Sequence, residues 1–307
     1  MHDPIGVIPV FVAVVEQGGF APAARILGVS KSAVSKRISQ AEERMGVRLL
    51  HRTTRKLSLT EAGERYYAYA VEALAAARLA EDSVTEMQST PQGRLRLNVP
   101  MSFGRLHIAP IIPDFLDRFP KIDVDMVMDD TVVDIVANGY DIALRGGMLA
   151  DSGLVARRIA PIRSVLCAAP SYLDRMGTPG VPADLASHHC LHYSNASDGR
   201  EWNLLGPAGN VQVATAARYC VNNSEALLSA VLAGAGIGRL PTFVCGEDLA
   251  AGRLVPLLTE YGFSEQALYA VFPARRHMPI KVRSFIEFMR ERFGGDMPYW
   301  DAALPAI

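Results

Sequence analysis

Short hydroxyls and cations are concentrated in one stretch near the start of the chain. They are Ser30, Lys31, Ser32, Ser35, Lys36 and Arg37. Hydroxyl, ammonium and guanidinium groups donate hydrogen bonds to base edges and phosphate oxygens, so this set is suited to DNA binding. Periodicity places most of it on one side of a helix over residues 31–44, whose other side is apolar (Val34, Ile38, Ala41 and Met45). An ordinary solvated amphipathic helix has the same pattern, and this helix alone leaves both interpretations open.

A second basic group follows in residues 47–59, which we predict to form two short strands around a turn. Arg52, Arg55 and Lys56 lie on or beside that turn. Two helices precede the hydroxyl-rich one, at 8–15 and 20–27, and Gly28 suits the left-handed turn before a helix capped by Ser30. Together these elements predict a helix-turn-helix with a basic wing that reaches phosphates or the minor groove.

Anion-binding chemistry is predicted farther along, where Ser102 and Phe103 follow a strand and open a helix. Free backbone N–H groups and a hydroxyl at such a junction can bind a carboxylate. Thr131, at the next strand-to-helix junction, and Asn223, before a later helix, are further candidates, although helix capping explains them equally well. Arg145 ends a strand and could pair with an anionic ligand, with Asp141 or with another acid.

Two patterns invite other chemistries. His188, Cys190 and His192 could share one face of a strand, but no second ligand cluster follows at a familiar spacing. The glycines of residues 233–238 mimic a dinucleotide loop, yet they join a helix to a strand, the reverse of the order that binds a pyrophosphate. We therefore expect neither a metal nor a cofactor. The chain also lacks the usual nucleophile motifs, so we expect no enzyme.

Charge is distributed unevenly along the 307 residues. Residues 1–62 hold nine Lys or Arg and five Asp or Glu, whereas the remainder is acidic. A composition that is 50% hydrophobic and 21% charged excludes a disordered chain. The four cysteines lack CxxC spacing, and neither a signal segment nor a stretch long enough to span a bilayer is found. These features predict a cytoplasmic protein with free thiols, a small basic head and no membrane partner.

A long helix without Gly or Pro should follow the head, over residues 64–89. Mostly small residues recur along it at alternating spacings of four and three: Tyr66, Ala70, Ala73, Ala77, Ala80, Val84 and Met87. A 3.5-residue period of this kind favours pairing with a second helix at close approach. We therefore expect a homo-oligomer, at least a dimer, which supplies the two heads that a two-fold operator needs.

Strands and helices alternate over the rest of the chain. We predict strands at 95–99, 122–126 and 141–144 with helices at 106–119 and 132–138. The same alternation returns at 163–168, 227–233 and 237–240, and a last strand and helix fall at 267–272 and 282–293. This alternation predicts parallel sheets flanked by helices.

The order of residues in the head closely resembles the winged helix-turn-helix of LysR-type transcriptional regulators, without gaps over about sixty residues. The matching runs are Phe11-Val12-Ala13-Val14-Val15-Glu16, Leu27-Gly28-Val29-Ser30, Ser32-Ala33-Val34-Ser35, Gly46-Val47-Arg48-Leu49-Leu50 and Thr60-Glu61-Ala62-Gly63. The resemblance implies that Lys31, Ser32, Ser35 and Lys36 meet bases and phosphates, and that Arg52 meets the DNA backbone. This sequence departs at Ser32, which is often proline in the family, and at Lys36, which is usually arginine. A lysine is a point charge and lacks the bidentate fork of arginine.

The later residues resemble the effector domain of the same family, a two-lobed fold like that of periplasmic binding proteins. The runs that carry this likeness are Ser102-Phe103-Gly104, Gly139-Tyr140-Asp141-Ile142-Ala143 and Ala233-Gly234-Ala235-Gly236-Ile237-Gly238. The resemblance implies an α/β protein overall, with a winged helix-turn-helix rich in α-helix (1–60), a dimerisation linker helix (61–89) and an effector-binding domain (90–295). Lobe one would hold 94–163 and 268–295, lobe two 164–267, and a tail would hold 296–307.

The function implied is a DNA-binding transcriptional regulator that senses a small organic anion, in particular a carboxylate, at Ser102. A solute-binding protein or an enzyme built on the two-lobed domain is the alternative. The basic head favours the regulator, because neither alternative needs one.

Overall fold

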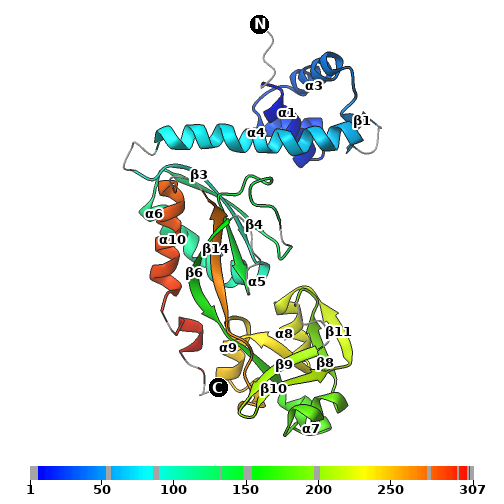
Figure 1. Ribbon diagram of the computed structural model, residues 1–307, viewed down its shortest axis with the longest axis vertical. Coiled ribbons are helices and arrows are strands. Elements are labelled where there is room, and N and C mark those ends of the chain that lie inside the picture. The colour runs from blue at the N-terminus through cyan, green and yellow to red at the C-terminus, as the bar shows by residue number, and fades with distance from the viewer. Residues whose placement is uncertain are drawn as a thin grey trace. The chain divides into compact units, whose positions relative to one another are not determined.

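The structure is a computed structural model of the chain. It describes residues 6–52, 57–85, 90–131, 133–147, 154–196, 201–274, 278–295, 297–302 and 304. The chain forms two compact units: Met1–Ser89 with Val133–Tyr140, and Thr90–Val132 with Asp141–Ile307. Figure 1 shows the helical head and the two-sheet remainder that these units contain.

Three short helices form the core of the head: α1 (Ile8–Glu16), α2 (Phe20–Ile26) and α3 (Lys31–Met45). Gly28 has a φ of 65°, and Ser30 Oγ accepts a hydrogen bond from Ala33 N at 3.1 Å, so the predicted turn and helix cap are both confirmed. Val34 and Ile38 are buried where the periodicity of α3 placed them.

The wing is a two-stranded antiparallel hairpin of β1 (Leu50–Arg52) and β2 (Leu57–Leu59), as predicted. Arg52 is the last residue of β1 and stands opposite Leu57. The predicted DNA contact Arg55 lies outside the described residues.

The long helix α4 (Glu61–Thr85) begins directly after the wing. Its first turns pack on the head: Ala70 and Val71 are buried with Val12, and the rings of Phe11 and Tyr66 meet edge to face at 5.1 Å. The first two members of the predicted seam, Tyr66 and Ala70, therefore contact the head of their own chain. The next members, Ala73, Ala77 and Ala80, are exposed, whereas Met87 lies outside the described residues.

The first sheet of the second unit has the strand order β4-β3-β5-β14-β6. Its strands are β3 (Gly93–Val99), β4 (Ile122–Met128), β5 (Ile142–Gly146), β6 (Leu154–Ile162) and β14 (Gln266–Pro273). Strands β3, β4 and β5 are parallel, but β14 runs antiparallel to β5 and β6. The prediction of a wholly parallel sheet is therefore wrong, because β6 leads to the second sheet and β14 returns from it without an intervening crossover helix.

Two predicted helices of this unit differ in the structure. The helix expected at 106–119 is divided into η1 (Gly104–Ile108), η2 (Ala109–Ile111) and α6 (Ile112–Arg118), because Pro110 and Pro113 have no N–H to continue one ladder. The prediction of a helix at 132–138 is wrong, because residues 135–139 form a turn in the part of the chain that the structure describes. Asp134 accepts hydrogen bonds from Val136 N and Ala137 N, and Gly139, at a φ of 64°, ends this single turn.

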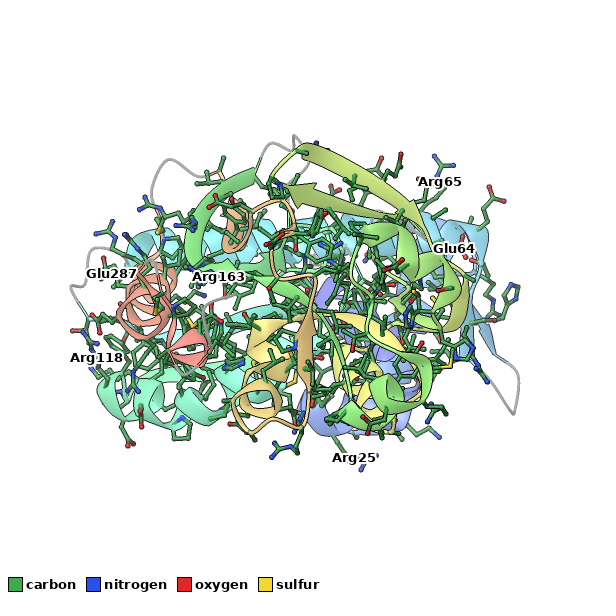
Figure 2. The ribbon with its side chains drawn as sticks, turned by 90° about the horizontal axis from the view of Figure 1, so that it is seen from below. Arg25, Glu64, Arg65, Arg118, Arg163 and Glu287 are labelled. Carbon is green, nitrogen blue, oxygen red and sulfur yellow. The ribbon has the colours of Figure 1, made fainter. Side chains whose placement is uncertain are left out.

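The main core of this unit lies between the first sheet and the helices α6 and α10 (Ile280–Phe293), which lie along one side of it (Figure 1). Phe115 of α6 and Phe285 of α10 meet edge to face at 5.2 Å. Outside this core, Arg118 pairs with Glu291 at 2.5 Å, and Figure 2 shows Arg118 and Glu287 projecting from the two helices.

The second sheet has the strand order β11-β8-β12-β7-β13. Its strands are β7 (Ser164–Ala168), β8 (Cys190–Tyr193), β11 (Ala217–Val221), β12 (Ile237–Pro241) and β13 (Val255–Leu257). The helices α7 (Pro170–Met176), α8 (Ser224–Leu232) and α9 (Thr242–Ala250) and the hairpin of β9 (Glu201–Gly206) and β10 (Gly209–Ala214) complete this part. This sheet is mixed too, because β7 runs antiparallel to β12 and β13.

Candidate nucleic-acid interface and effector site

The polar side of α3 faces solvent. The exposed residues are Ser30, Lys31, Ser32, Lys36 and Arg37, with Ser35 half-buried beside them. The opposite side of the helix is in the head core, so the burial of its apolar side fixes the direction of the polar side. The structure thus brings together all the predicted DNA contacts of this helix.

The start of α3 carries a small hydroxyl network. Ser30 Oγ caps the helix through Ala33 N, and it lies 2.9 Å from Ser32 Oγ. One hydroxyl of this pair can donate to the other, which orients Ser32 at the first turn of the helix. Ser30 therefore has a structural role as a cap, whether or not it also meets DNA.

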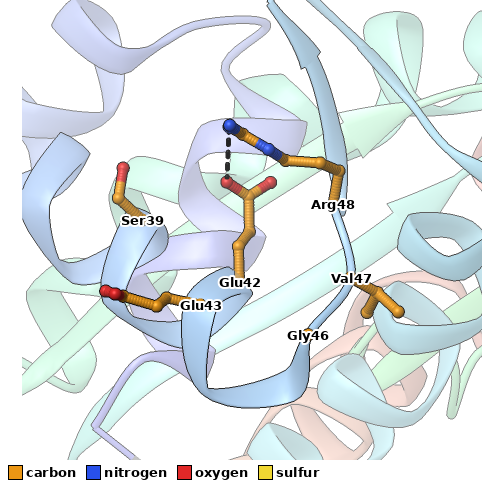
Figure 3. Close-up of a pocket in the computed structure, with 6 residues that line it drawn as sticks. All are labelled: Ser39, Glu42, Glu43, Gly46, Val47 and Arg48. Atoms are coloured by element: carbon orange, nitrogen blue, oxygen red, sulfur yellow. Dashed lines mark ion pairs between the residues drawn. The ribbon is translucent and has the colours of Figure 1, made fainter.

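Sequence reasoning missed Glu42, a carboxylate on the buried side of α3. Its carboxylate accepts hydrogen bonds from Leu49 N at 2.8 Å and Leu50 N at 3.1 Å, and Arg48 lies 3.5 Å from its other oxygen. Both residues line a hollow of about 510 Å³ together with Ser39, Glu43, Gly46 and Val47. Figure 3 shows the ion pair between Glu42 and Arg48. The position of Glu42, four residues after Ile38 in the apolar stripe, was a signal that could have revealed it.

The short helix α5 (Met101–Phe103) lies at the end of β3 and carries the predicted effector hydroxyl. Ser102 is 5% exposed, and its Oγ has no hydrogen-bond partner among the described residues. Next to it, Met101 N donates to Asp130 Oδ1 at 3.0 Å. A buried hydroxyl without a partner at the carboxyl edge of three parallel strands can donate to a small ligand.

The ring of Phe103 is part of an aromatic cluster in the core. Its centroid lies 4.9 Å from that of His107 and 5.2 Å from that of Phe243. The imidazole of His107 also meets Tyr299 OH at 2.5 Å and Phe243 O at 2.9 Å. Burial lowers the pKa of His107 below 6.5, although the hydrogen bond to Phe243 and the charge of Glu247 oppose the shift. Phe103 thus fixes the backbone beside Ser102.

Thr131 and Arg145 both lie near Asp129, at the same edge of the sheet. Thr131 N donates to Asp129 Oδ1 at 2.8 Å, and this hydrogen bond lowers the pKa of Asp129, with a smaller contribution from the charge of Arg145. Asp141, the partner first considered for Arg145, instead lies 3.3 Å from Lys281 Nζ. Arg145 Nη1 donates to Leu144 O at 2.9 Å.

Asn223 caps α8, since its Oδ1 accepts from Ala226 N at 2.8 Å. The capping interpretation of this residue is therefore confirmed, and its Nδ2 also lies 3.3 Å from Met101 Sδ. Burial and the charge of Asp130 raise the pKa of Tyr193 to about 12. Asn223 follows β11 and meets Met101, the residue before Ser102. Tyr193 ends β8 and interacts with Asp130, which accepts from Met101 N.

Comparison with known proteins shows two family matches. Residues 7–64 match the bacterial regulatory helix-turn-helix of the lysR family, and residues 88–294 match the LysR substrate binding domain. The chain belongs to the LysR family of transcriptional regulators. Its named relatives are transcriptional regulators and not enzymes, and this chain is a regulator of the same family. The LysR matches cover the wing hairpin and both sheets described above.

Relatives of this LysR regulator match it along nearly their whole length. The probable transcriptional regulator LtrA of Klebsiella pneumoniae is 38% identical over 287 residues, covering 92% of this chain and 93% of LtrA. The structure of CrgA from Neisseria meningitidis is 34% identical, with a TM-score of 0.62 over 96% of this chain and all of that one. The Vibrio cholerae virulence activator AphB is 27% identical, with a TM-score of 0.67 over 94% and 99% of the two chains.

The histidines of residues 188–192 make hydrogen bonds within this LysR regulator. His188 Nδ1 lies 3.1 Å from Tyr172 OH, and His192 Nε2 lies 2.9 Å from Thr215 Oγ1, so both histidines of the set His188, Cys190 and His192 have partners in the protein. Among the residues described, no group of three His, Cys, Asp or Glu is arranged to hold a metal ion. Within the same residues, no helix is both long and apolar enough to cross a membrane.

Proposed function

We propose that this LysR-type regulator reads double-stranded DNA with α3 and the wing. Contacts come from Ser30, Lys31, Ser32, Ser35, Lys36 and Arg37 on the helix, and from Arg52 and Arg55 on the wing. The observation that carries this proposal is the exposed, hydroxyl-rich and cationic side of α3, held outward by the burial of Val34 and Ile38. Small side chains let the helix enter the major groove, while the cations neutralise phosphates.

Two substitutions test the DNA contacts. Lys36→Ala and Arg52→Ala should weaken binding to the DNA upstream of the regulator's own gene. Each should reduce the slope of log affinity against log salt by about 0.9, because a phosphate contact releases one counterion. The measurement is fluorescence anisotropy over a range of salt concentrations. Lys121→Ala, an exposed lysine of the second unit, is the control and should leave the slope unchanged. Wild-type slopes in both test variants would contradict these contacts.

The effector is proposed to be a small organic carboxylate that binds at Ser102, between the two lobes. The observation that supports this site is the buried Ser102 Oγ, which lacks a partner among the described residues. Thr131, Arg145 and Asn223 lie at the same edge or meet its neighbours, and Arg145 supplies a positive charge for the anion. Phe103 supports the site from the core side.

Assembly is proposed to occur through α4, in a homodimer or a homotetramer. The exposed small residues Ala73, Ala77 and Ala80 are suited to close helix pairing. The domain limits proposed are 1–60 for the head, 61–89 for the linker helix, 90–295 for the effector domain and 296–307 for the tail. A cytoplasmic location follows from the need to reach DNA.

A further inference from the structure

Glu42 is a charged group on the buried side of α3, which we call the recognition helix because we propose that it reads DNA. The residue is 4% exposed and follows the buried residues Val34, Ile38 and Ala41 on that side of α3. A carboxylate in such surroundings is unfavourable unless hydrogen bonds and a positive charge compensate for its lost hydration. The partners of Glu42 therefore show what the group holds in place.

Those partners belong to the start of the wing. Glu42 Oε1 accepts from the backbone N–H groups of Leu49 and Leu50 at 2.8 Å and 3.1 Å. Leu50 is the first residue of β1, and Arg52 is its last. A single oxygen of the recognition helix thus fixes the wing strand two residues before the cation that we assign to the DNA backbone.

Residues at the start of the linker helix also bind the segment 48–50 through hydrogen bonds. Thr60 N donates to Leu49 O at 3.0 Å, Thr60 Oγ1 donates to Arg48 O at 2.6 Å, and Gly63 N donates to Thr60 Oγ1 at 2.9 Å. Gly63 packs so closely that a Cβ there would lie 2.0 Å from Leu49 O. Residues 48–50 therefore join the recognition helix, the wing and the linker helix through hydrogen bonds.

We propose that Glu42 is a positioning residue for DNA binding. Its carboxylate holds β1 against α3 in the position from which Arg52 reaches a DNA phosphate. The inference rests on the proposed Arg52 contact. Glu42 acts through the strand, because the carboxylate is buried and accepts hydrogen bonds from the backbone amides of Leu49 and Leu50. Loss of the acceptor should release the wing while the polar side of α3 keeps its own contacts.

Arg48 determines how the test must be designed. Its guanidinium is exposed and lies 3.5 Å from Glu42 Oε2, so any substitution of Glu42 also frees a cation near the DNA. Glu42→Gln frees Arg48 but keeps an oxygen that accepts from both amides. Glu42→Ala frees Arg48 and removes that oxygen. The comparison between these two variants isolates the acceptor.

The experiment measures the salt dependence of DNA binding for the full-length protein with Glu42→Gln and Glu42→Ala, each with and without Arg52→Ala. Glu42→Ala should have a slope about 0.9 smaller than Glu42→Gln. Arg52→Ala should reduce the slope by the same amount beside Glu42→Gln and should have no effect beside Glu42→Ala. Thermal unfolding of each variant sets a temperature at which all are folded.

The outcomes distinguish a positioning role of Glu42 from a purely stabilising one, and from failure of the proposed Arg52 contact. A head that is merely destabilised binds less DNA but keeps its slope and its response to Arg52→Ala, and that result would overturn the positioning role. Equal slopes for Glu42→Gln and Glu42→Ala would overturn it as well, even where Arg52→Ala alone reduces the slope. If Arg52→Ala leaves the slope of the wild-type protein unchanged, the proposed Arg52 contact itself fails, and the inference fails with it.

Discussion

Single residues differ in reactivity according to where they lie, and the cysteines show this directly. Cys220 is exposed on β11, whereas Cys167, Cys190 and Cys245 are buried. Burial raises the pKa of Cys190 to about 12, and a hydrogen bond with Cys245, together with burial, raises the pKa of Cys167. Thiolates are the reactive form, so the buried thiols should be inert.

We expect iodoacetamide at pH 8 to modify one thiol of the folded protein, as counted by intact mass. Cys220→Ser should abolish that modification, and denaturation should make all four thiols of the wild-type protein reactive. Modification of two or more thiols under native conditions would show that the second unit opens more readily than its packing indicates.

His107 should make stability depend on pH. Its pKa is lowered in the folded protein by burial, so the unfolded chain binds more protons in the range just below pH 6.5. The free energy of unfolding should therefore rise as pH increases through that range. His107→Gln should flatten this rise in chemical denaturation at several pH values. An unchanged pH dependence in the variant would mean that folding does not lower the pKa of His107.

Residue roles set by the local backbone could be predicted from the sequence. Gly28, Ser30 and Asn223 have the conformations or caps that their neighbours require, and the structure shows each of them. Roles set by tertiary contact could not be predicted. Glu42 is bound by amides seven and eight residues away, and Phe103 packs on a ring from α9, so neither partner was visible in the local pattern.

At the scale of elements, periodicity predicted helices well where one side is buried. The expected range 31–44 for the recognition helix compares with Lys31–Met45. It failed at 132–138, where an apolar pattern resembles a helix but the Asp134 carboxylate and Gly139 limit the segment to one turn. It also overlooked the hairpin β9–β10, whose strands are held together by pairing with each other.

The linker helix gives a prediction at this scale. If Ala77 lies in a helix pair, Ala77→Glu should bury an uncompensated charge at a cost of about 3–5 kcal/mol and lower the oligomeric state. Ala68→Glu is the matched control, because Ala68 is exposed and lies nine residues earlier, on the opposite side of α4. Light scattering should show a smaller mass for Ala77→Glu alone. Equal masses for both variants and wild type would exclude this seam.

For the whole molecule, the family resemblance implied two α/β lobes, but the alternation of strands and helices gave the wrong direction for several strands. The alternation of strands and helices does not show which strands enter a sheet from the other lobe, and therefore does not show which strands run antiparallel. Strands β6 and β14 pair antiparallel over eight residues of β14, and each joins the first sheet to the second. Strand β6 therefore leads from the first sheet to the second, and β14 leads back.

The proposed response to the effector belongs to this scale. A ligand shifts the molecule only if it binds one arrangement of the lobes more tightly, and a coupling of roughly 1–3 kcal/mol is sufficient to change transcription. Ser102→Ala removes a hydroxyl that has no partner among the described residues, so the fold should tolerate the change. The variant should keep its affinity for DNA but lose the response of a reporter gene to the inducing carboxylate. Ser229→Ala is the control, because that hydroxyl donates to Glu225 O within its own helix, and it should respond like wild type. A normal response from Ser102→Ala, or loss of DNA binding without any ligand, would exclude Ser102 as the effector site.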